Sequence, residues 1–116
     1  MPNPMMQEQT TAEKLPDFIQ IQNHNLLVLC EQHQVRSMAI FGSAVGEHFD
    51  PRRSDLDFAV QFKQMPPAAH AEHFFALLNA LHDLFKRPID LLETSAIRNP
   101  YLRAKIQSQQ VIVYGN

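Results

Sequence analysis

The chain has 116 residues, of which 45% are hydrophobic and 19% are charged, and its formal net charge is −2. This composition is typical of a soluble globular protein. The slightly negative net charge excludes a general attraction to nucleic acid or anionic membranes, although a local basic patch could still bind either one. The length suits one domain with a real core, without room for a separate substrate domain.

The single cysteine, Cys30, excludes an intrachain disulfide and a thiolate metal site. It follows an apolar run that starts at Leu26, so we expect a buried thiol rather than a nucleophile. Residues 1–14 are polar and carry early prolines, which predicts a flexible segment before a single domain over residues 15–116. We expect no signal peptide or membrane span, and a cytoplasmic protein.

The first expected element is a helix from Pro16 to about His33, because proline suits a first helical turn. Its covered side is predicted to carry Phe18, Ile21, Asn25 and Val28, widened by Ile19, Leu26, Leu29 and Cys30. A first strand is predicted over Val35–Phe41. Its two faces would carry Val35, Ser37, Ala39 and Phe41 on one side, and Met38 and Ile40 on the other.

Gly42 and Ser43 follow that strand directly, and a polar loop of eleven residues, 44–54, precedes a second strand at about Asp55–Phe62. A turn is expected over Met65–Ala69. The helix after it should end at Lys86 and Arg87, and its apolar face comprises Phe74, Leu77, Leu78, Leu81, Leu84 and Phe85.

A third strand is predicted over Pro88–Glu93, and Asn99–Pro100 has the pattern of an N-cap that opens a further helix. The chain then reaches a fourth strand over Val111–Tyr114. This order of elements predicts an α+β fold, with a mixed four-stranded sheet whose helices pack mainly on one face, leaving the other available for chemistry.

Two carboxylates stand out at the start of the second strand. Side chains alternate along a strand, so Asp55 and Asp57 should share one face, while the aliphatic and aromatic residues between them fill the other. Like charges that close are costly unless a cation holds them or one takes a proton. Together with Asp90 on a neighbouring strand, they could hold Mg²⁺ for phosphoryl or nucleotidyl transfer, with Gly42 and Ser43 presenting the backbone and a hydroxyl to phosphate oxygens.

The run Phe41-Gly42-Ser43, followed after the loop by residues 54–60, Ser-Asp-Leu-Asp-Phe-Ala-Val, resembles the signature of the DNA polymerase β nucleotidyltransferase superfamily. The resemblance covers about residues 35–114, and is greatest to the MNT-type minimal nucleotidyltransferases, antitoxins that act beside HEPN-domain toxins. It implies a polymerase β palm-like fold. It also implies that Gly42 and Ser43 bind the nucleotide triphosphate.

By the same resemblance, Asp55, Asp57 and Asp90 would be the catalytic residues and the ligands of two Mg²⁺ ions, with Asp90 also helping to deprotonate the acceptor. One departure is that Val45 precedes Gly46, where many relatives have a basic residue, in a loop about one residue longer than usual. The loop arginines at positions 52 and 53 are candidates for the missing charge, and a solvated surface is the alternative for them.

Ordinary structural roles are open for several of these residues. Asp55 and Asp57 could form surface ion pairs, and Asp90 could satisfy a loop amide. His70 and His73 lie three apart on a predicted helix, which does not by itself predict zinc. The aromatic residues of that helix have the spacing of core residues, not of a base-stacking platform.

The leading functional hypothesis is a Mg²⁺-dependent nucleotidyltransferase antitoxin that, by its resemblance, transfers AMP from ATP to a tyrosine of a partner HEPN toxin. No membrane partner and no direct nucleic-acid partner are expected. Two alternatives stay open: a non-catalytic module that neutralises its partner by covering it, and a homo-oligomeric enzyme that adenylylates a small molecule.

Overall fold

The computed structural model describes residues 15–45, 50 and 55–115. In chain order its elements are α2 (Asp17–Gln20), α3 (Asn23–Gln32), β1 (Val35–Phe41), the 3-10 turn η1 (Gly42–Val45), β2 (Leu56–Phe62), α4 (Pro67–Phe85), β3 (Ile89–Glu93), the 3-10 turn η2 (Thr94–Ala96), α5 (Pro100–Gln109) and β4 (Val111–Tyr114). The segment 1–14, predicted to be flexible, lies outside the described residues, and the single domain over residues 15–116 stays a prediction. None of the helices described is long and apolar enough to cross a membrane.

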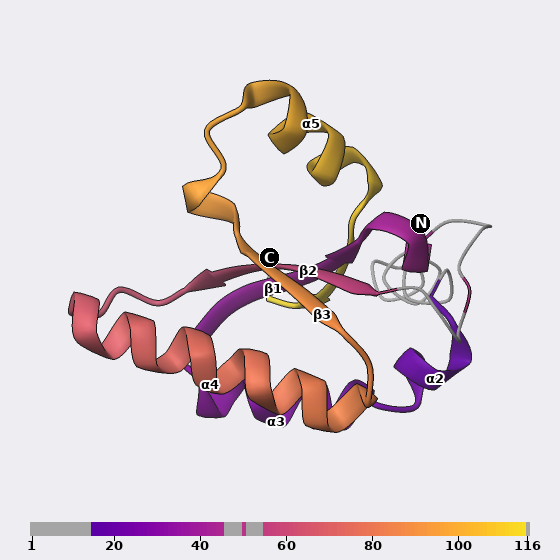
Figure 1. The fold of residues 1–116 in the computed structure, drawn as a ribbon, viewed down its shortest axis with the longest axis horizontal. Helices are drawn as coiled ribbons and strands as arrows, with labels where there is room; N and C mark the ends of the chain where they lie inside the picture. The colour runs from indigo at the N-terminus through magenta and orange to yellow at the C-terminus, as the bar shows by residue number, and fades with distance from the viewer. Residues whose placement is uncertain (1–14, 46–49, 51–54, 116) are drawn as a thin grey trace, which may run out of the picture.

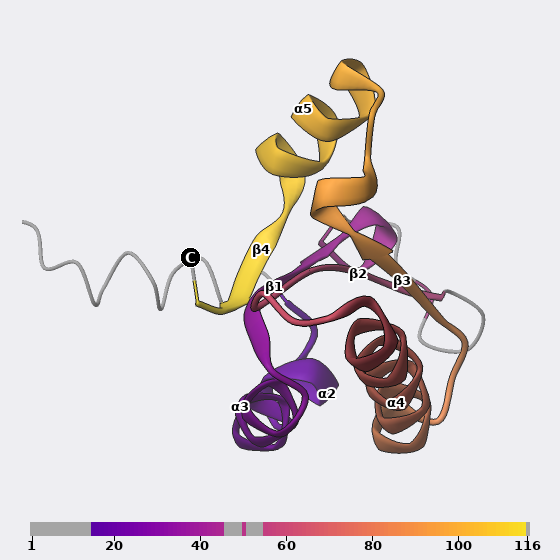
Figure 2. The same cartoon turned by 90° about the vertical axis from the view of Figure 1, so that its left-hand side faces the viewer.

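The strands form one mixed sheet in the order β3-β2-β1-β4. β1 runs antiparallel to both β2 and β4, whereas β2 and β3 are parallel. Figures 1 and 2 show α3 and α4 beneath one face of the sheet and α5 across the other. The predicted α+β fold, with a four-stranded mixed sheet and helices mainly on one face, is confirmed.

The main core lies between the sheet and the helices α3 and α4. Leu56, Phe58 and Val60 of β2 are fully buried there, as the alternation along this strand predicts, and they pack with Leu77 and Leu81 of α4. Burying each such side chain stabilises the fold by about 1.5–3 kcal/mol. The residues between them therefore point to the opposite face of the sheet.

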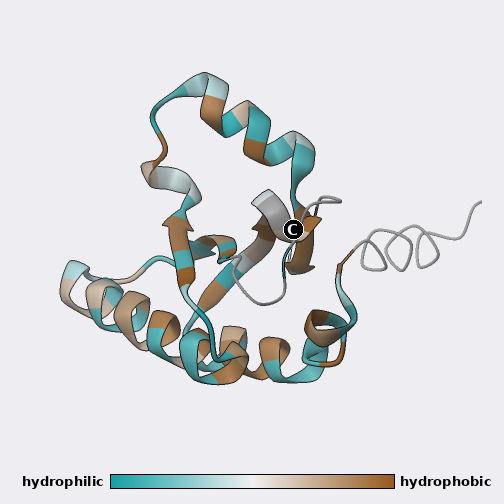
Figure 3. Ribbon diagram, turned by 45° about the vertical axis from the view of Figure 1, so that its right-hand side comes forward, coloured by the Kyte–Doolittle hydropathy of each residue, from teal (hydrophilic) through white to brown (hydrophobic). Residues whose placement is uncertain are grey.

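A smaller core lies on that opposite face, where α5 is anchored. Ala59 of β2, Ile97 and Ile106 are buried together, with Phe41 and Leu92 packed against them. Figure 3 shows apolar residues over most of the strands but a mixture of polar and apolar residues along α5. α5 therefore covers part of the face that the sequence left free for chemistry.

The single helix predicted from Pro16 to about His33 is wrong, because the chain forms α2 and α3 with a turn between them. The turn tightens where the amide of Gln22 donates to the carbonyl oxygen of Ile19, three residues back rather than four. Ile21, which we expected on the covered side, is 78% exposed as a result, while Ile19, Leu26 and Cys30 are buried.

Two further expectations need correction. Val35 packs in the main core with Met38 and Ile40, because a register shift between Val35 and Ser37 reverses the side that the start of β1 presents. The expected turn over Met65–Ala69 is partly helical, since α4 begins at Pro67. Proline fits the first helical position and alanine is the best helix former, so the Pro-Ala-Ala run starts the helix.

The other end of the chain follows its sequence signals. The side chain of Asn99 accepts hydrogen bonds from the amides of Tyr101 and Leu102, and Pro100 is the first residue of α5, as the N-cap pattern predicts. The guanidinium of Arg103 donates to the carbonyl oxygen of Ile97 at 2.5 Å, which ties the helix to the loop before it. α5 thus holds a fixed position over the sheet beside η1.

Candidate active site

The predicted site residues meet at one edge of the sheet. β1 ends where β2 and β3 begin, because β1 is antiparallel to β2 while β2 and β3 are parallel. Asp57 is the register partner of Phe41 on one side and of Asp90 on the other. Gly42, directly after β1, therefore lies beside Asp57 of β2 and Asp90 of β3.

The side chains of Asp57 and Asp90 lie on register partners of adjacent strands, close enough for Asp90 to act on the charge of Asp57. Burial raises the pKa of Asp57, and the neighbouring charge of Asp90, the charge of Asp55 and a side-chain hydrogen bond with Asp90 raise it further. Two carboxyl groups can share a hydrogen bond only if one of them carries a proton, whereas two ionised carboxylates this close need a cation to offset their repulsion. Placing two acidic side chains together costs free energy that packing alone does not offset, so the arrangement indicates a functional site.

Gly42 closes the third side of this group. It has φ +74, in the left-handed region that favours glycine. A β-carbon added there would lie 2.2 Å from Oδ2 of Asp57, closer than any real contact of this kind. The absence of a side chain at Gly42 is therefore what lets the carboxylate lie against the backbone at the start of η1.

The remaining predicted residues lie at different distances from this group. Asp55 is exposed and precedes β2 by one residue, so it acts on Asp57 through its charge. Ser43 is the second residue of η1. The loop arginines at positions 52 and 53, and Gly46, lie outside the described residues.

The donor set fits a magnesium ion in its chemistry. Carboxylate oxygens are the ligands that Mg²⁺ prefers, and the ion usually takes only one or two of them, completing its shell with water and substrate phosphates. Among residues 15–45, 50 and 55–115, no three His, Cys, Asp or Glu side chains are arranged to hold an ion without such help. Asp57 and Asp90 are the two carboxylates that the fold brings together.

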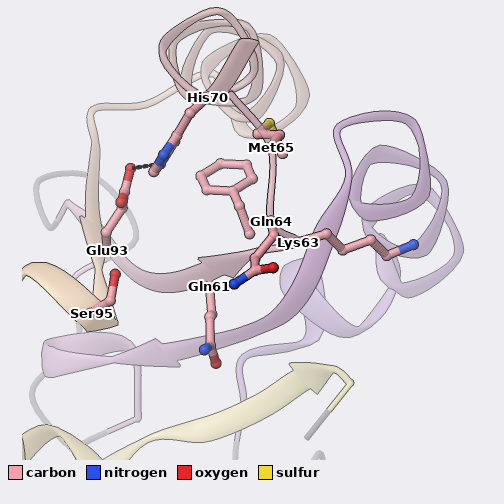
Figure 4. Close-up of a pocket in the computed structure, with 8 residues that line it drawn as sticks. Gln61, Lys63, Gln64, Met65, His70, Glu93 and Ser95 are labelled. Atoms are coloured by element: carbon pink, nitrogen blue, oxygen red, sulfur yellow. Dashed lines mark hydrogen bonds and ion pairs between the residues drawn. The ribbon is translucent and has the colours of Figure 1, made fainter. Parts of the chain in front are cut away.

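A second feature lies at the far end of the same strands and was not predicted from the sequence. The side chains of His70 on α4 and Glu93 at the end of β3 are joined at 2.7 Å between Nε2 and Oε1 (Figure 4). They border a hollow of about 570 Å³, lined also by Gln61–Met65 and Ser95. A smaller hollow of about 320 Å³ lies on the other side of the pair, against Phe74 and Phe75.

This hollow is not the carboxylate site, since Gln61 and Glu93 lie four and three residues along their strands from Asp57 and Asp90. At about 3.3 Å per residue, the two features are roughly 10–13 Å apart. His73 does not join His70 in a metal site, because its ring packs against that of His33, with centroids 6.1 Å apart. The interpretation of these histidines as surface and packing residues is consistent with these contacts.

Cys30 is fully buried in the main core. Burial, with a smaller contribution from the charge of Glu31, raises the pKa of its thiol to about 12. A thiol of that pKa carries almost no thiolate near neutral pH, so it has no nucleophilic role.

Comparison with known proteins identifies the family of this chain. Residues 20–116 match the family described as polymerase beta nucleotidyltransferase. The chain belongs to the polymerase beta nucleotidyltransferase family. The resemblance that rests on Gly42-Ser43 and the Asp55-x-Asp57 pair, and the predicted enzyme class of nucleotidyltransferase, are thereby confirmed at the level of the family.

Three known proteins are similar to this nucleotidyltransferase in sequence or in fold. A Methanocaldococcus jannaschii protein named as a protein adenylyltransferase is 35% identical over 86 residues, which are 74% of this chain and 84% of the relative. A solved structure of a minimal nucleotidyltransferase is 25% identical, with a TM-score of 0.60, over 82% of this chain and 92% of that one. A tri-AMPylated Shewanella oneidensis HEPN toxin in complex with an MNT antitoxin matches at 20% identity and a TM-score of 0.54, over 84% of this chain and 72% of that one.

Proposed function

We propose that this nucleotidyltransferase is a Mg²⁺-dependent protein adenylyltransferase, and an antitoxin that transfers AMP from ATP to a tyrosine of a partner HEPN toxin. The observation that carries the proposal is the juxtaposition of Gly42, Asp57 and Asp90 at one edge of the sheet. The name of the archaeal relative supports transfer to a protein, and the AMPylated toxin complex supports a HEPN partner.

In this proposal Gly42 and Ser43 hold the triphosphate, and Asp55, Asp57 and Asp90 hold the metal. Bound Mg²⁺ would neutralise the charge on the phosphates and on the carboxylates. The phenolic oxygen of the acceptor tyrosine attacks the α-phosphorus of ATP. The bond from that phosphorus to the oxygen bridging to the β-phosphate breaks, and pyrophosphate leaves.

The proton of the phenol needs an acceptor, and in this proposal Asp90 receives it. It lies beside Asp57 on the edge strand β3 and is exposed, whereas Asp57 is enclosed between β1 and β3. An acceptor hydroxyl can therefore reach Asp90 more readily than Asp57. The roles of the two carboxylates differ accordingly, with Asp57 positioning and neutralising, and Asp90 also moving the proton.

The test is transfer of label from α-labelled ATP, with Mg²⁺, to the protein encoded by the neighbouring gene, which the proposal expects to be a HEPN toxin. We expect label on the partner with the wild-type chain. Asp57→Asn should lower the transfer rate by at least about 100-fold, because replacing a residue that binds the metal should cost more than replacing a residue that only hydrogen-bonds to a metal ligand. Asp83→Asn, an exposed position on α4, is the matched control and should transfer normally. Equal transfer by Asp57→Asn and the wild type would overturn the proposal.

The same material separates the alternatives. If the double replacement Asp55→Asn and Asp57→Asn still neutralises the toxin in cells, the non-catalytic module is the better description. If label reaches a small acceptor but not the HEPN protein, and native mass measurement finds a homo-oligomer, the small-molecule enzyme is the better description.

A further inference from the structure

We propose that the outer edge of β3 and the hollow beside Glu93 dock an extended segment of the acceptor protein, with a basic side chain of that segment held by Glu93. This inference rests on the proposed function, because it names how the acceptor is recognised. It concerns residues that the transfer chemistry does not use.

β3 is an edge strand of the sheet, and β2 is its only neighbour among the strands that the structure describes. Within the described ranges, no backbone hydrogen bond from outside the sheet ends on β3 residues. An extended peptide can therefore add to this edge as a further strand, with its main chain paired to β3. Figure 1 shows β3 at the front of the molecule, without a described element across it.

The alternation of side chains fixes what such a peptide would present. A residue paired beside Asp90 points to the same face as Asp90, where the transfer takes place. A residue three positions away pairs beside Glu93 and points to the opposite face, because three steps along a strand change the side. An acceptor hydroxyl and a side chain three residues from it would then enter the two sites together.

The chemistry of the hollow selects that second side chain. The carboxylate of Glu93 lies at the junction of the two hollows, with a 20% exposed side chain, and His70 contacts one of its oxygens. The ring of Phe62 adjoins the rings of His70 and Phe74, with centroids 5.4 and 6.5 Å apart. An acid beside aromatic rings fits a cationic head on an apolar stem, which is an arginine or a lysine.

Besides His70, which contacts one oxygen of Glu93, the basic side chain that lines the hollow does not fill that role. Lys63 lines the hollow, but Figure 4 shows its ammonium group extending away from Glu93. A positive charge brought by the acceptor would thus meet a carboxylate that the chain's own lysine leaves accessible.

The experiment measures initial rates of AMP transfer to the acceptor protein identified by the label-transfer test, while the acceptor and ATP concentrations are varied separately. Glu93→Gln keeps the shape and removes the charge, and we expect it to raise KM for the acceptor about tenfold, the usual effect of losing one charge-assisted hydrogen bond. KM for ATP and kcat should not change. Glu72→Gln, exposed on α4, is the matched control and should leave all three constants unchanged.

A charge exchange tests the pairing without relying on the folding of one variant. Peptide mapping locates the modified residue of the acceptor, and the basic residue three positions from it is replaced by glutamate. That change should raise KM for the acceptor, and Glu93→Lys should restore it. Absence of a basic residue there, or absence of rescue, would overturn the docking proposal.

The outcomes also separate this proposal from the function on which it rests. No label on any acceptor with the wild-type chain overturns the proposed function itself. Normal transfer with an unchanged acceptor KM in Glu93→Gln overturns only the docking site. Formation of a homodimer through β3, detected by cross-linking of a cysteine placed at Leu92 in Cys30→Ser protein, would assign this edge to a second copy of the chain and overturn the docking proposal.

Discussion

Gly42 and Asp57 lie so close that a single β-carbon on the glycine would collide with the carboxylate, at 2.2 Å from Oδ2. The contact joins two motifs that are separated in sequence by a loop. It makes the glycine a part of the carboxylate site as well as of the turn after β1.

Gly42→Ala should therefore damage both stability and chemistry. The positive φ costs about 1–2 kcal/mol for a residue with a side chain, and the β-carbon must displace Asp57. We expect a lower melting temperature and a loss of about tenfold or more in transfer rate per folded molecule, because a displacement near 1 Å can cost up to about 100-fold. Thermal unfolding and the label-transfer assay measure the two effects.

Gly115 provides the control for that variant. It also has a positive φ, +67, and its added β-carbon would meet the carbonyl oxygen of Arg36 at 2.2 Å. Gly115→Ala should lose stability but keep its transfer rate per folded molecule, since it contacts no residue of the site. Equal loss of transfer in both variants would show that strain alone, not the position of Asp57, causes the effect.

Asp57→Asn should make the metal-free protein more stable near neutral pH. The pKa of Asp57 is raised above its ordinary value of 3.8, so the folded state binds this proton more tightly than the unfolded state. The protonated carboxyl stabilises the fold at low pH, and this contribution is lost as the pH rises through the raised pKa. Removing the charge avoids that loss.

The measurement is the melting temperature of both proteins from pH 3 to pH 8 in a chelator. The advantage of Asp57→Asn should be a few degrees at the upper end and should disappear toward pH 3, where the wild-type carboxyl is protonated. Added Mg²⁺ should stabilise the wild type more than the variant. A pH-independent difference would contradict the prediction.

Leu81→Ala should cost about 2–5 kcal/mol of unfolding free energy, because the leucine is fully buried in the main core between α4 and the sheet. Phe75→Ala removes a larger side chain from the same helix, but Phe75 is 60% exposed and should cost less than about 1 kcal/mol. Urea unfolding of the two variants compares these costs. A greater cost for Phe75 would place it in a contact that the fold does not show.

Cys30 should react with iodoacetamide only when the core opens. Its thiol is buried and its pKa is about 12, so thiolate is scarce and inaccessible in the folded state at pH 8. The labelling rate should rise with urea in parallel with unfolding. Fast labelling of the folded protein would contradict the burial of Cys30.

The sequence predicts all four strands to within about one residue, because their apolar alternation and their Gly, Pro and Asn boundaries agree. It cannot predict the break near Ile21, since that residue fits the helical stripe and only the tight turn at Gln22 exposes it. The contact between His70 and Glu93 cannot be predicted from the sequence either, because the two residues are 23 positions apart and meet only through the way α4 crosses the parallel strands β2 and β3.

The candidate site shows the same division. The carboxylates of Asp55 and Asp57 can be placed on one side from their spacing, but the register that sets Asp57 beside Asp90 follows from the parallel pairing of their strands. The part of the small core formed by Ile97 and Ile106 was not predicted, because each lies alone among polar residues. Only the fold brings them over Ala59.

The position of β1 has a consequence for how the chain reaches this fold. Its Ile40 pairs with Phe58 of β2, which follows soon after, and with Val111 of β4, near the other end of the sequence. On a ribosome, β1 would keep one hydrogen-bonding edge open until the last strand has emerged. Such long-range closure slows folding and exposes an apolar strand to misassembly, so the nascent chain should depend on chaperones or early partner binding until β4 is in place.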